Sequence, residues 1–180
     1  MKKISILVIT TLLISSCSSS TQKSSPGFLP NCDQIKVLDT EDKSIPMQCL
    51  DGSGSINFYQ LKGPMVINVW GSWCEGCKEE MPYFVDLYET QAFESGQIQL
   101  LGMNVEESSK EDAIEYIKKS GMSWPHLEDL DGISKSIFGP GVPVTWFINE
   151  EGKNVGTKIG AYTNKDQLFE QVEKAFGIKL

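Results

Sequence analysis

The sequence contains no arginine, so all 16 of its basic residues are lysines, against 24 aspartates and glutamates. Its formal net charge is −8. Without arginine, the planar two-point recognition of phosphates and carboxylates is not available. The lysines are not gathered into a block either, and nucleic-acid binding needs clustered positive charge. We therefore expect no nucleic-acid partner.

Histidine is almost as scarce, because His126 is the only one. A zinc site needs four soft ligands to converge, and a single histidine makes such a site a weak candidate. His126 could be a metal ligand or a proton donor, but a lone histidine after Trp124-Pro125 is more simply a loop residue. We expect no bound metal and no organic cofactor.

Long apolar runs are missing apart from the start of the chain. Met1-Lys2-Lys3 is a short basic region, and residues 4–14 are largely apolar but too short for a confident membrane span. The run ends in Ile14-Ser15-Ser16-Cys17, which resembles a bacterial lipobox, in which the cysteine becomes the lipidated first residue of the mature protein. We therefore interpret residues 1–16 as a lipoprotein signal peptide and Cys17 as the lipidation site. A plain cleaved signal with an incidental cysteine is the alternative.

Residues 17–31 have the composition of a tether, because they are rich in serine, threonine, glycine and proline. About thirteen such residues span roughly 45 Å when fully extended and about 20 Å on average. The sequence thus predicts an extracytoplasmic, membrane-anchored lipoprotein in the bacterial periplasm or on the cell surface. Residues 32–180 are left for one domain, and 40% hydrophobic residues suffice for its core.

One stretch of this domain carries residues for chemistry. Met65 to Trp70 is an apolar, β-rich run, Gly71-Ser72 ends it, and Cys74 and Cys77 follow before a helical pattern begins. Strand, turn and helix place Cys74 at a helix N-terminus, where unpaired N–H groups and the helix dipole stabilise a thiolate. Cys77, three residues further on, is close enough to form a disulfide with it. The pair is therefore predicted to be a reversible dithiol/disulfide couple.

Five cysteines are an odd number for an exported protein. Lipidation of Cys17 and the Cys74–Cys77 couple leave Cys32 and Cys49. Outside the cytosol such a pair is expected to form a structural disulfide, which contributes on the order of 3 kcal/mol to stability. A second redox-active pair is the alternative, and a zinc site is a weaker one.

The rest of the chain alternates strands and helices. Strands are expected at Met65–Trp70, Gln97–Val105, Val142–Asn149 and Asn154–Tyr162, with a short strand or turn at Ile56–Gly63 and a short extended piece at Trp124–Asp129. Helices are expected from near Cys74 to about Phe93 with Pro82 inside, from Ser109 to Ser120, over Ile133–Phe138, and from Asn164 to Phe176. These elements predict an α/β fold, a three-layer sandwich in which helices flank a mixed central sheet.

Two motifs carry a resemblance to a known family. Trp73-Cys74-Glu75-Gly76-Cys77 after a strand, with Gly141-Val142-Pro143-Val144-Thr145 later in the chain, resembles the thioredoxin superfamily. The order of elements from about Ile35 to Leu180 agrees with its fold. The exported, tethered form and the Trp-Gly-Ser-Trp-Cys context look most like the TlpA/ResA-like branch. The members of that branch are extracytoplasmic thiol–disulfide oxidoreductases, and several serve cytochrome c maturation.

The resemblance implies roles for particular residues. Cys74 is expected to be the attacking thiol and Cys77 the resolving thiol. Pro143 matches the cis-proline that faces the disulfide, and the backbone of Val142 is expected to pair with an extended substrate segment. Glu80 matches the acidic residue behind the cysteines, which exchanges a proton with Cys77 if burial raises its pKa toward neutrality. An exposed helical glutamate is the alternative for this residue.

Three further residues of the motif bear on the direction of the reaction. Trp73, next to the attacking thiol, is expected to form a lid on the site and to contact substrate. Gly76 departs from the family pattern, because most members have proline there, and glycine loosens the start of the helix. Glu75 adds negative charge near the thiolate, and a less stabilised thiolate makes a stronger reductant. We therefore expect the couple to reduce its substrates.

The predicted function is the reduction of disulfides in exported proteins through a mixed disulfide. The resemblance implies that a membrane-embedded thiol carrier re-reduces the couple. Three alternatives remain open. One is an oxidase of the same fold that donates disulfides. Another is a copper-delivery protein with Cys74, Cys77 and His126 as Cu(I) ligands. The third is a lipoprotein without enzyme activity that binds unfolded chains.

Overall fold

The protein is described by a computed structural model that covers residues 29–40, 43–129 and 132–180. In chain order its elements are η1 (Cys32–Gln34), β1 (Pro46–Cys49), β2 (Ser55–Asn57), η2 (Phe58–Gln60), β3 (Met65–Trp70), α1 (Glu75–Tyr88), α2 (Gln91–Glu94), β4 (Gln99–Val105), α3 (Lys110–Ser120), β5 (His126–Asp129), α4 (Ser134–Phe138), β6 (Val144–Ile148), β7 (Asn154–Ile159) and α5 (Lys165–Phe176), where η marks a 3-10 helix.

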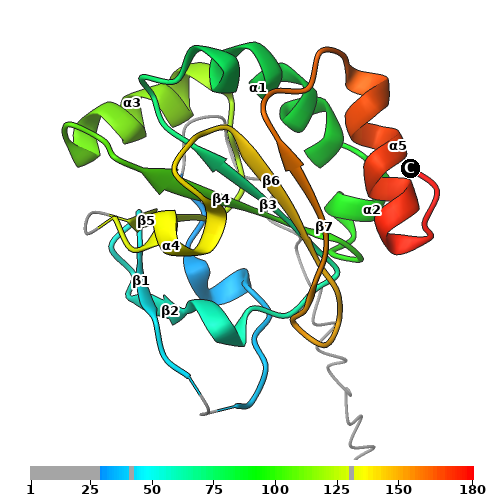
Figure 1. Ribbon diagram of the computed structural model, residues 1–180, viewed down its shortest axis with the longest axis horizontal. Coiled ribbons are helices and arrows are strands. Elements are labelled where there is room, and N and C mark those ends of the chain that lie inside the picture. Colours follow the sequence, from blue (N-terminus) through cyan, green and yellow to red (C-terminus); the bar gives the residue numbers. More distant parts are fainter. Residues whose placement is uncertain (1–28, 41–42, 130–131) are drawn as a thin grey trace, which may run out of the picture.

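The strands of this part of the chain form one seven-stranded sheet in the order β2-β1-β5-β4-β3-β6-β7 (Figure 1). The sheet is mixed, because β3 runs parallel to β4 and antiparallel to β6. The predicted α/β fold with a mixed central sheet is therefore confirmed. Since β3 has a partner on both sides, its carboxyl end, where the cysteine motif begins, lies within the sheet and not at its edge.

Strand β3 is buried over its whole length, which explains its apolar and β-branched sequence. Its side chains alternate between two cores. Met65, Ile67 and Val69 belong to the core on one face of the sheet, and Val66 and Trp70 to the core on the other face. Trp70 has no exposed surface.

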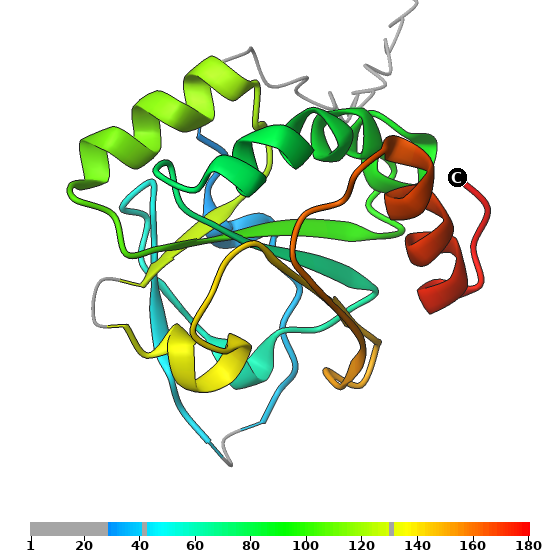
Figure 2. The same cartoon turned by 45° about the horizontal axis from the view of Figure 1, so that its top comes forward.

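The helices cover the two faces of the sheet in two separate layers (Figure 2). Residues of α1, α2, α3 and α5 pack into the core that contains Trp70. Residues of η1, η2 and α4 pack into the core that contains Val69. The result is the predicted three-layer sandwich, with the cysteine-bearing helix α1 on the face covered by the longer helices.

Helices α3 and α5 lie where the sequence predicts them. The N–H of Asp112 donates to Ser109 Oγ over 3.2 Å, and the N–H of Gln167 donates to Asn164 Oδ1 over 3.0 Å, so Ser109 and Asn164 are the N-caps of the two helices. Helix α3 ends at Gly121, whose φ of 75° lies in the left-handed region that glycine adopts without strain.

The helix after the cysteines is shorter than predicted. It ends at Tyr88, and α2 is a separate helix. The break lies at Thr90, whose backbone is extended (φ −75°, ψ 153°) and whose Oγ1 donates to the Leu87 carbonyl over 2.8 Å. That bond satisfies one of the carbonyls left free at the end of α1. The prediction of one helix to about Phe93 is therefore wrong, whereas Pro82 lies inside α1 without ending it.

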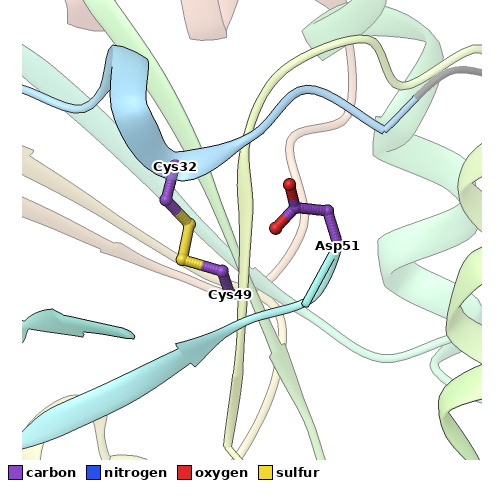
Figure 3. Close-up of side chains that lie close together, drawn as sticks. All are labelled: Cys32, Cys49 and Asp51. Atoms are coloured by element: carbon purple, nitrogen blue, oxygen red, sulfur yellow. A yellow bond between two sulfur atoms is a disulfide. The ribbon is translucent and has the colours of Figure 1, made fainter. Parts of the chain in front are cut away.

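The sequence does not reveal β1, which joins the N-terminal part of the chain to the sheet. Its burial alternates over four residues only, with Met47 and Cys49 buried, and so short a pattern is a weak signal. A disulfide joins Cys49 to Cys32 of η1, and Asp51 lies beside it (Figure 3). These three residues could group as metal ligands, but two sulfurs in a disulfide are not the thiolates that a zinc site uses.

His126 is not a loop residue, contrary to the expectation. It begins β5 and is 2% exposed, and its ring centroid lies 5.5 Å from that of Trp70 and 5.7 Å from that of Trp124. A side chain on Gly102 of β4 would overlap the imidazole, so glycine on the neighbouring strand makes the space for it. Burial lowers the pKa of His126 to about 3, and the ring is therefore neutral.

The predicted signal peptide, Cys17 and most of the predicted tether lie outside the described residues. The described chain begins at Leu29, which packs against the core, and Asn31 accepts a hydrogen bond from the N–H of Asp33 at the start of η1. Residues 29–31, part of the predicted tether, therefore contact the folded domain. No helix within residues 29–40, 43–129 and 132–180 is long and apolar enough to cross a bilayer.

Candidate active site

Cys74 lies where strand β3 gives way to helix α1. A short turn follows Trp70, and Cys74 is the N-cap of α1, with an extended backbone (φ −82°, ψ 113°). The N–H of Cys77 donates to Cys74 Sγ over 3.1 Å. The free N–H groups of the helix therefore face the sulfur, which is the environment that stabilises a thiolate.

The two cysteines form a disulfide, and their Cα atoms lie 5.3 Å apart. Cys74 is 5% exposed, whereas Cys77 has no exposed surface. Cys74 is thus more covered than the sequence suggests, because α1 packs closely on the sheet and both cysteines join its core. Of the two residues, Cys74 is the one with surface that a partner can reach.

Pro143 faces the cysteine motif from the start of β6, and the Val142–Pro143 peptide bond is cis. A side-chain carbon on Gly76 would lie 3.5 Å from Pro143 Cδ and 3.5 Å from Ala161 Cβ. The proline ring and Ala161 therefore flank the glycine between the two cysteines. The N–H of Gly160 donates to the Pro143 carbonyl over 2.9 Å, so the segment after β7 reaches the same place.

Trp73 is the exposed aromatic residue of the site, with half of its surface (50%) accessible. Its Nε1 donates to the carbonyl of Val105, at the end of β4, over 3.4 Å. The indole is therefore held across the rim of the sheet next to Cys74. A large, exposed aromatic side chain in a fixed position is suited to contact with another protein.

Glu80 lies one helical turn after Cys77 and has no exposed surface. Its Oε1 accepts from Asn68 Nδ2 over 3.1 Å, and its Oε2 accepts from the N–H of Tyr162 over 2.9 Å. Burial raises the pKa of Glu80 to about 7, while the two hydrogen bonds and the positive charge of Lys158 oppose the rise. A carboxyl group with this pKa can both accept and release a proton near neutral pH. The alternative of an exposed glutamate is excluded.

Glu75, the second acidic residue of the motif, lies in solvent and has a partner. Lys78 Nζ lies 3.3 Å from Glu75 Oε2, with 79% of the Glu75 side chain and 42% of the Lys78 side chain exposed. Water screens such a pair, so its contribution to stability is small. Lys78 therefore offsets part of the negative charge that Glu75 brings next to Cys74.

Glu107 is a residue of the site that sequence reasoning missed. Its carboxylate accepts from the N–H of Ser72 (2.5 Å), from Ser72 Oγ (2.6 Å) and from Asn104 Nδ2 (2.7 Å). These bonds join the end of β4 to the turn that leads into Trp73. From the sequence alone, Glu106-Glu107 would be interpreted as exposed acidic residues that lead into the next helix. The position of the pair argues against solvation of both residues. Glu106-Glu107 directly follow a buried strand that runs parallel to β3, and the carboxyl ends of parallel strands lie at the same edge of a sheet.

The structure does not bring His126 to the cysteines. Within the described residues, no cluster of three potential metal ligands contains Cys74 or Cys77. The histidine lies instead in the core beside Trp70, and neither of its ring nitrogens has a hydrogen-bond partner. The arrangement therefore gives no support to a Cu(I) site with His126 as the third ligand.

The fold and the site together define the class of protein. A thioredoxin-like sheet, a Cys-x-x-Cys disulfide at the N-terminus of the following helix and a cis-proline beside it are the features of thiol–disulfide oxidoreductases, which are enzymes. More particularly, the chain belongs to the AhpC/TSA family, whose model matches residues 40–154.

Curated relatives carry names of the same class. Thiol-disulfide oxidoreductase ResA of Bacillus subtilis (strain 168) is 32% identical over 126 residues, which cover 69% of this chain and 63% of the relative, less than two thirds of its length. Sporulation thiol-disulfide oxidoreductase A of the same strain is 28% identical over 141 residues, 78% of this chain and 77% of the relative. Among solved structures, a secreted Mycobacterium tuberculosis disulfide oxidoreductase homologous to E. coli DsbE has the same fold, with a TM-score of 0.61, 19% identity, and coverage of 73% of this chain and 96% of that one.

Burial of Glu80 predicts a specific pH dependence of stability. Its pKa rises from 4.5 to about 7 on folding, so the unfolded state ionises first as pH increases. The contribution of Glu80 to stability is therefore fully present below about pH 4.5 and falls by up to about 3 kcal/mol between about pH 4.5 and pH 7. In Glu80→Gln this loss is absent. Urea unfolding of both oxidised proteins from pH 4.5 to 8 checks it. If the free energy of unfolding of wild type and Glu80→Gln changed equally with pH, Glu80 would not be a buried carboxyl group with a raised pKa.

Glu107 provides a second prediction, because its carboxylate accepts three hydrogen bonds at the turn before Trp73. Glu107→Ala is expected to lower the free energy of unfolding by about 1–3 kcal/mol and to slow the reaction of reduced Cys74 with a small disulfide several-fold, since the turn before the nucleophile loosens.

The matched control for this variant is Glu111→Ala, which removes the same charge from an exposed position of α3. Denaturant unfolding and stopped-flow kinetics measure the two quantities. Equal effects of Glu107→Ala and Glu111→Ala on both would show that the contacts with Ser72 and Asn104 do not position the site.

Proposed function

We propose that this protein reduces disulfides in exported proteins while a lipid on Cys17 holds it at a membrane. The observation that carries the proposal is the Cys74–Cys77 disulfide at the N-terminus of α1, with a buried carboxyl group of neutral pKa one turn behind it. A dithiol that must lose two protons and two electrons needs both parts, a stabilised thiolate and a nearby proton acceptor.

In the first step, the thiolate of reduced Cys74 attacks one sulfur of a substrate disulfide. The Cys74–substrate bond forms, the substrate S–S bond breaks, and the released substrate sulfur takes up a proton. The exposure of Cys74, in contrast to the complete burial of Cys77, supports this assignment of the attacking sulfur. The N–H of Cys77, directed at Cys74 Sγ, is positioned to stabilise the attacking thiolate.

In the second step, Cys77 resolves the mixed disulfide. Its thiol gives its proton to the carboxylate of Glu80, and the resulting thiolate attacks Cys74 Sγ. The Cys74–Cys77 disulfide forms, and the second substrate thiolate leaves and is protonated. Two electrons have then passed from the protein to the substrate. The position of Glu80 on the same face of α1, one turn beyond Cys77, supports its role in this proton transfer.

Substrate contacts are proposed for three residues around Cys74. Trp73 offers the exposed aromatic surface, Pro143 flanks the motif, and Val142 lies partly exposed two residues before β6. An extended substrate segment that pairs with the backbone of Val142 would carry its disulfide past Cys74, as in strand addition. Because the recognition would use backbone groups and one aromatic surface, the substrate disulfide should lie in an extended or unfolded segment.

Reduction is proposed as the direction because negative charge lies close to both sulfurs. The ionised form of Glu80 is buried with them, and Glu75 follows Cys74 directly. Negative charge destabilises the thiolate of the reduced form and so makes the couple a stronger reductant. A membrane thiol carrier then has to return two electrons and two protons to the pair, and cytochrome c apoprotein is one candidate among the exported substrates.

The midpoint potential of the Cys74/Cys77 couple tests the direction. By equilibration with dithiothreitol, we expect a value near that of thioredoxin, about −270 mV, since the charges around the pair oppose the thiolate. A value near that of the strong periplasmic oxidants, about −120 mV, would instead establish the disulfide-donating alternative.

Substitution of each cysteine separately distinguishes the two steps of the reaction in a turnover assay. Cys74→Ser should abolish the turnover of a disulfide-bonded substrate, while Cys77→Ser should accumulate the mixed disulfide at Cys74. Unchanged activity of Cys74→Ser would favour a lipoprotein that only binds unfolded chains. Tight Cu(I) binding together with negligible disulfide turnover would favour copper delivery.

The lipid anchor predicts how the protein partitions in cells. Wild-type protein expressed in a bacterium should fractionate with the membrane and enter the detergent phase of a Triton X-114 separation. Cys17→Ser should remain in the aqueous phase, because the acyl chains supply the membrane affinity. The matched control is Ser18→Ala, which changes the neighbouring residue and leaves the thiol. Equal partitioning of all three proteins would contradict lipidation at Cys17.

A further inference from the structure

Lys158 of β7 is a cation that lies near the site but outside its sequence motifs. Its Nζ donates to three backbone carbonyls in a row, those of Ile159 (2.9 Å), Gly160 (2.9 Å) and Ala161 (3.2 Å). Most surface lysines extend into water because their charge is strongly hydrated. Here all three donors of the ammonium are directed into one loop of the protein.

The loop that Lys158 binds contacts each part of the site. The N–H of Gly160 donates to the Pro143 carbonyl, Ala161 flanks Gly76 of the motif, and the N–H of Tyr162 donates to Glu80 Oε2. Figure 2 shows this segment between β7 and α5 passing alongside α1. Fixing its carbonyls therefore fixes the donor that Glu80 depends on.

The ammonium also brings charge to the same place. Lys158 Nζ lies 5.5 Å from the ring centroid of Tyr162, a cation–π distance, and the ring is almost fully buried. Thr145 is the cross-strand partner of Lys158 on β6, and Asn68 is that of Thr145 on β3. These three residues therefore line one row of the sheet that leads to the carboxyl of Glu80, to which Asn68 is hydrogen-bonded.

We propose that Lys158 is the positioning residue that keeps Glu80 available as the acceptor of the Cys77 proton, by ordering the loop before Tyr162 and by placing a positive charge beside it. The proposal rests on the proposed function, in which Glu80 takes that proton. Burial alone would hold the carboxyl in its protonated form at neutral pH, and a protonated carboxyl cannot accept the proton. A nearby cation favours the ionised form.

Other titratable groups around Glu80 do not replace this charge. Tyr162 from the β7–α5 segment and Tyr116 from α3 face it, and burial raises the pKa of both phenols, so both remain neutral near pH 7. On its own helix, Glu75 is negative and Cys77 is the proton donor in question. Among the groups that influence Glu80 in the described structure, Lys158 is the one that carries positive charge.

The test compares Lys158→Met with Lys158→Gln, which loses the charge but keeps an amide that can donate to a loop carbonyl. Lys158→Arg keeps the charge. Lys153→Met, in the turn before β7, is the matched control for loss of one exposed lysine charge. The readout is the pH titration of the Glu80 side-chain carboxyl by carbon-13 NMR in the oxidised protein, a measurement that does not depend on turnover.

Both neutral variants are expected to move the Glu80 midpoint upward by about half a unit to one unit, and Lys158→Arg and Lys153→Met are expected to leave it near the wild-type value. The resolving step, followed as release of substrate from a preformed mixed disulfide at Cys74, should then be about threefold to tenfold slower at pH 6 in the neutral variants and equal to wild type above pH 9.

Two results would overturn the proposal. One is an unmoved Glu80 midpoint in Lys158→Gln when the NMR spectrum shows a folded protein. The other is the same shift in Lys153→Met, because the effect would then be that of net charge alone. A moved midpoint with an unchanged pH–rate profile would show that Glu80 does not take the Cys77 proton. Absence of any substrate release by the wild-type protein would instead refute the proposed function, whatever the NMR titration shows.

Discussion

The burial of one carboxyl group between the central sheet and α1 is the constraint on which the site depends. Glu80 has no contact with solvent, so its charge is tolerated through the hydrogen bonds from the N–H of Tyr162 and from Asn68, together with the positive charge of Lys158. Asn68 is a polar residue in an otherwise apolar strand, and this contact explains it. Tyr162 reaches Glu80 because the β7–α5 segment crosses the site. The elements that build the fold are therefore also the elements that hold the carboxyl beside the disulfide.

The sequence was sufficient to predict the parts of the site that depend on local pattern. A buried strand, a short turn and an amphipathic helix place Cys74 at a helix N-terminus, and each of these elements has a strong signal in its own residues. The same holds for α3 and α5, whose caps are local hydrogen bonds. The local pattern gave the wrong end for the helix after the cysteines. At Thr90, the hydrogen bond from its hydroxyl to the Leu87 carbonyl accompanies the break between α1 and α2.

Long-range contacts account for what the sequence could not show. Glu107 is 35 residues from Ser72, and only the parallel pairing of β3 with β4 brings the two together. His126 is buried because Gly102, on the neighbouring strand, leaves space for its ring. In both cases the residue type alone suggests an exposed position. Whether a polar residue is solvated or buried is set by its partners across the sheet, and these do not follow from its neighbours in sequence.

In the proposed mechanism, the different burial of the two sulfurs sets the order of the two steps. A partner protein can approach the exposed edge of Cys74, whereas Cys77 is enclosed by the core and can be reached only from within the same helix turn. An intermolecular disulfide is therefore expected at Cys74, and its resolution is intramolecular. The proton that Cys77 must lose cannot pass directly to water, because no surface of the residue is exposed. A buried acceptor on the next turn solves that problem, and the requirement for it follows from the enclosure of Cys77 itself. The buried carboxyl group of Glu80 is therefore needed because the sulfur of Cys77 is itself buried.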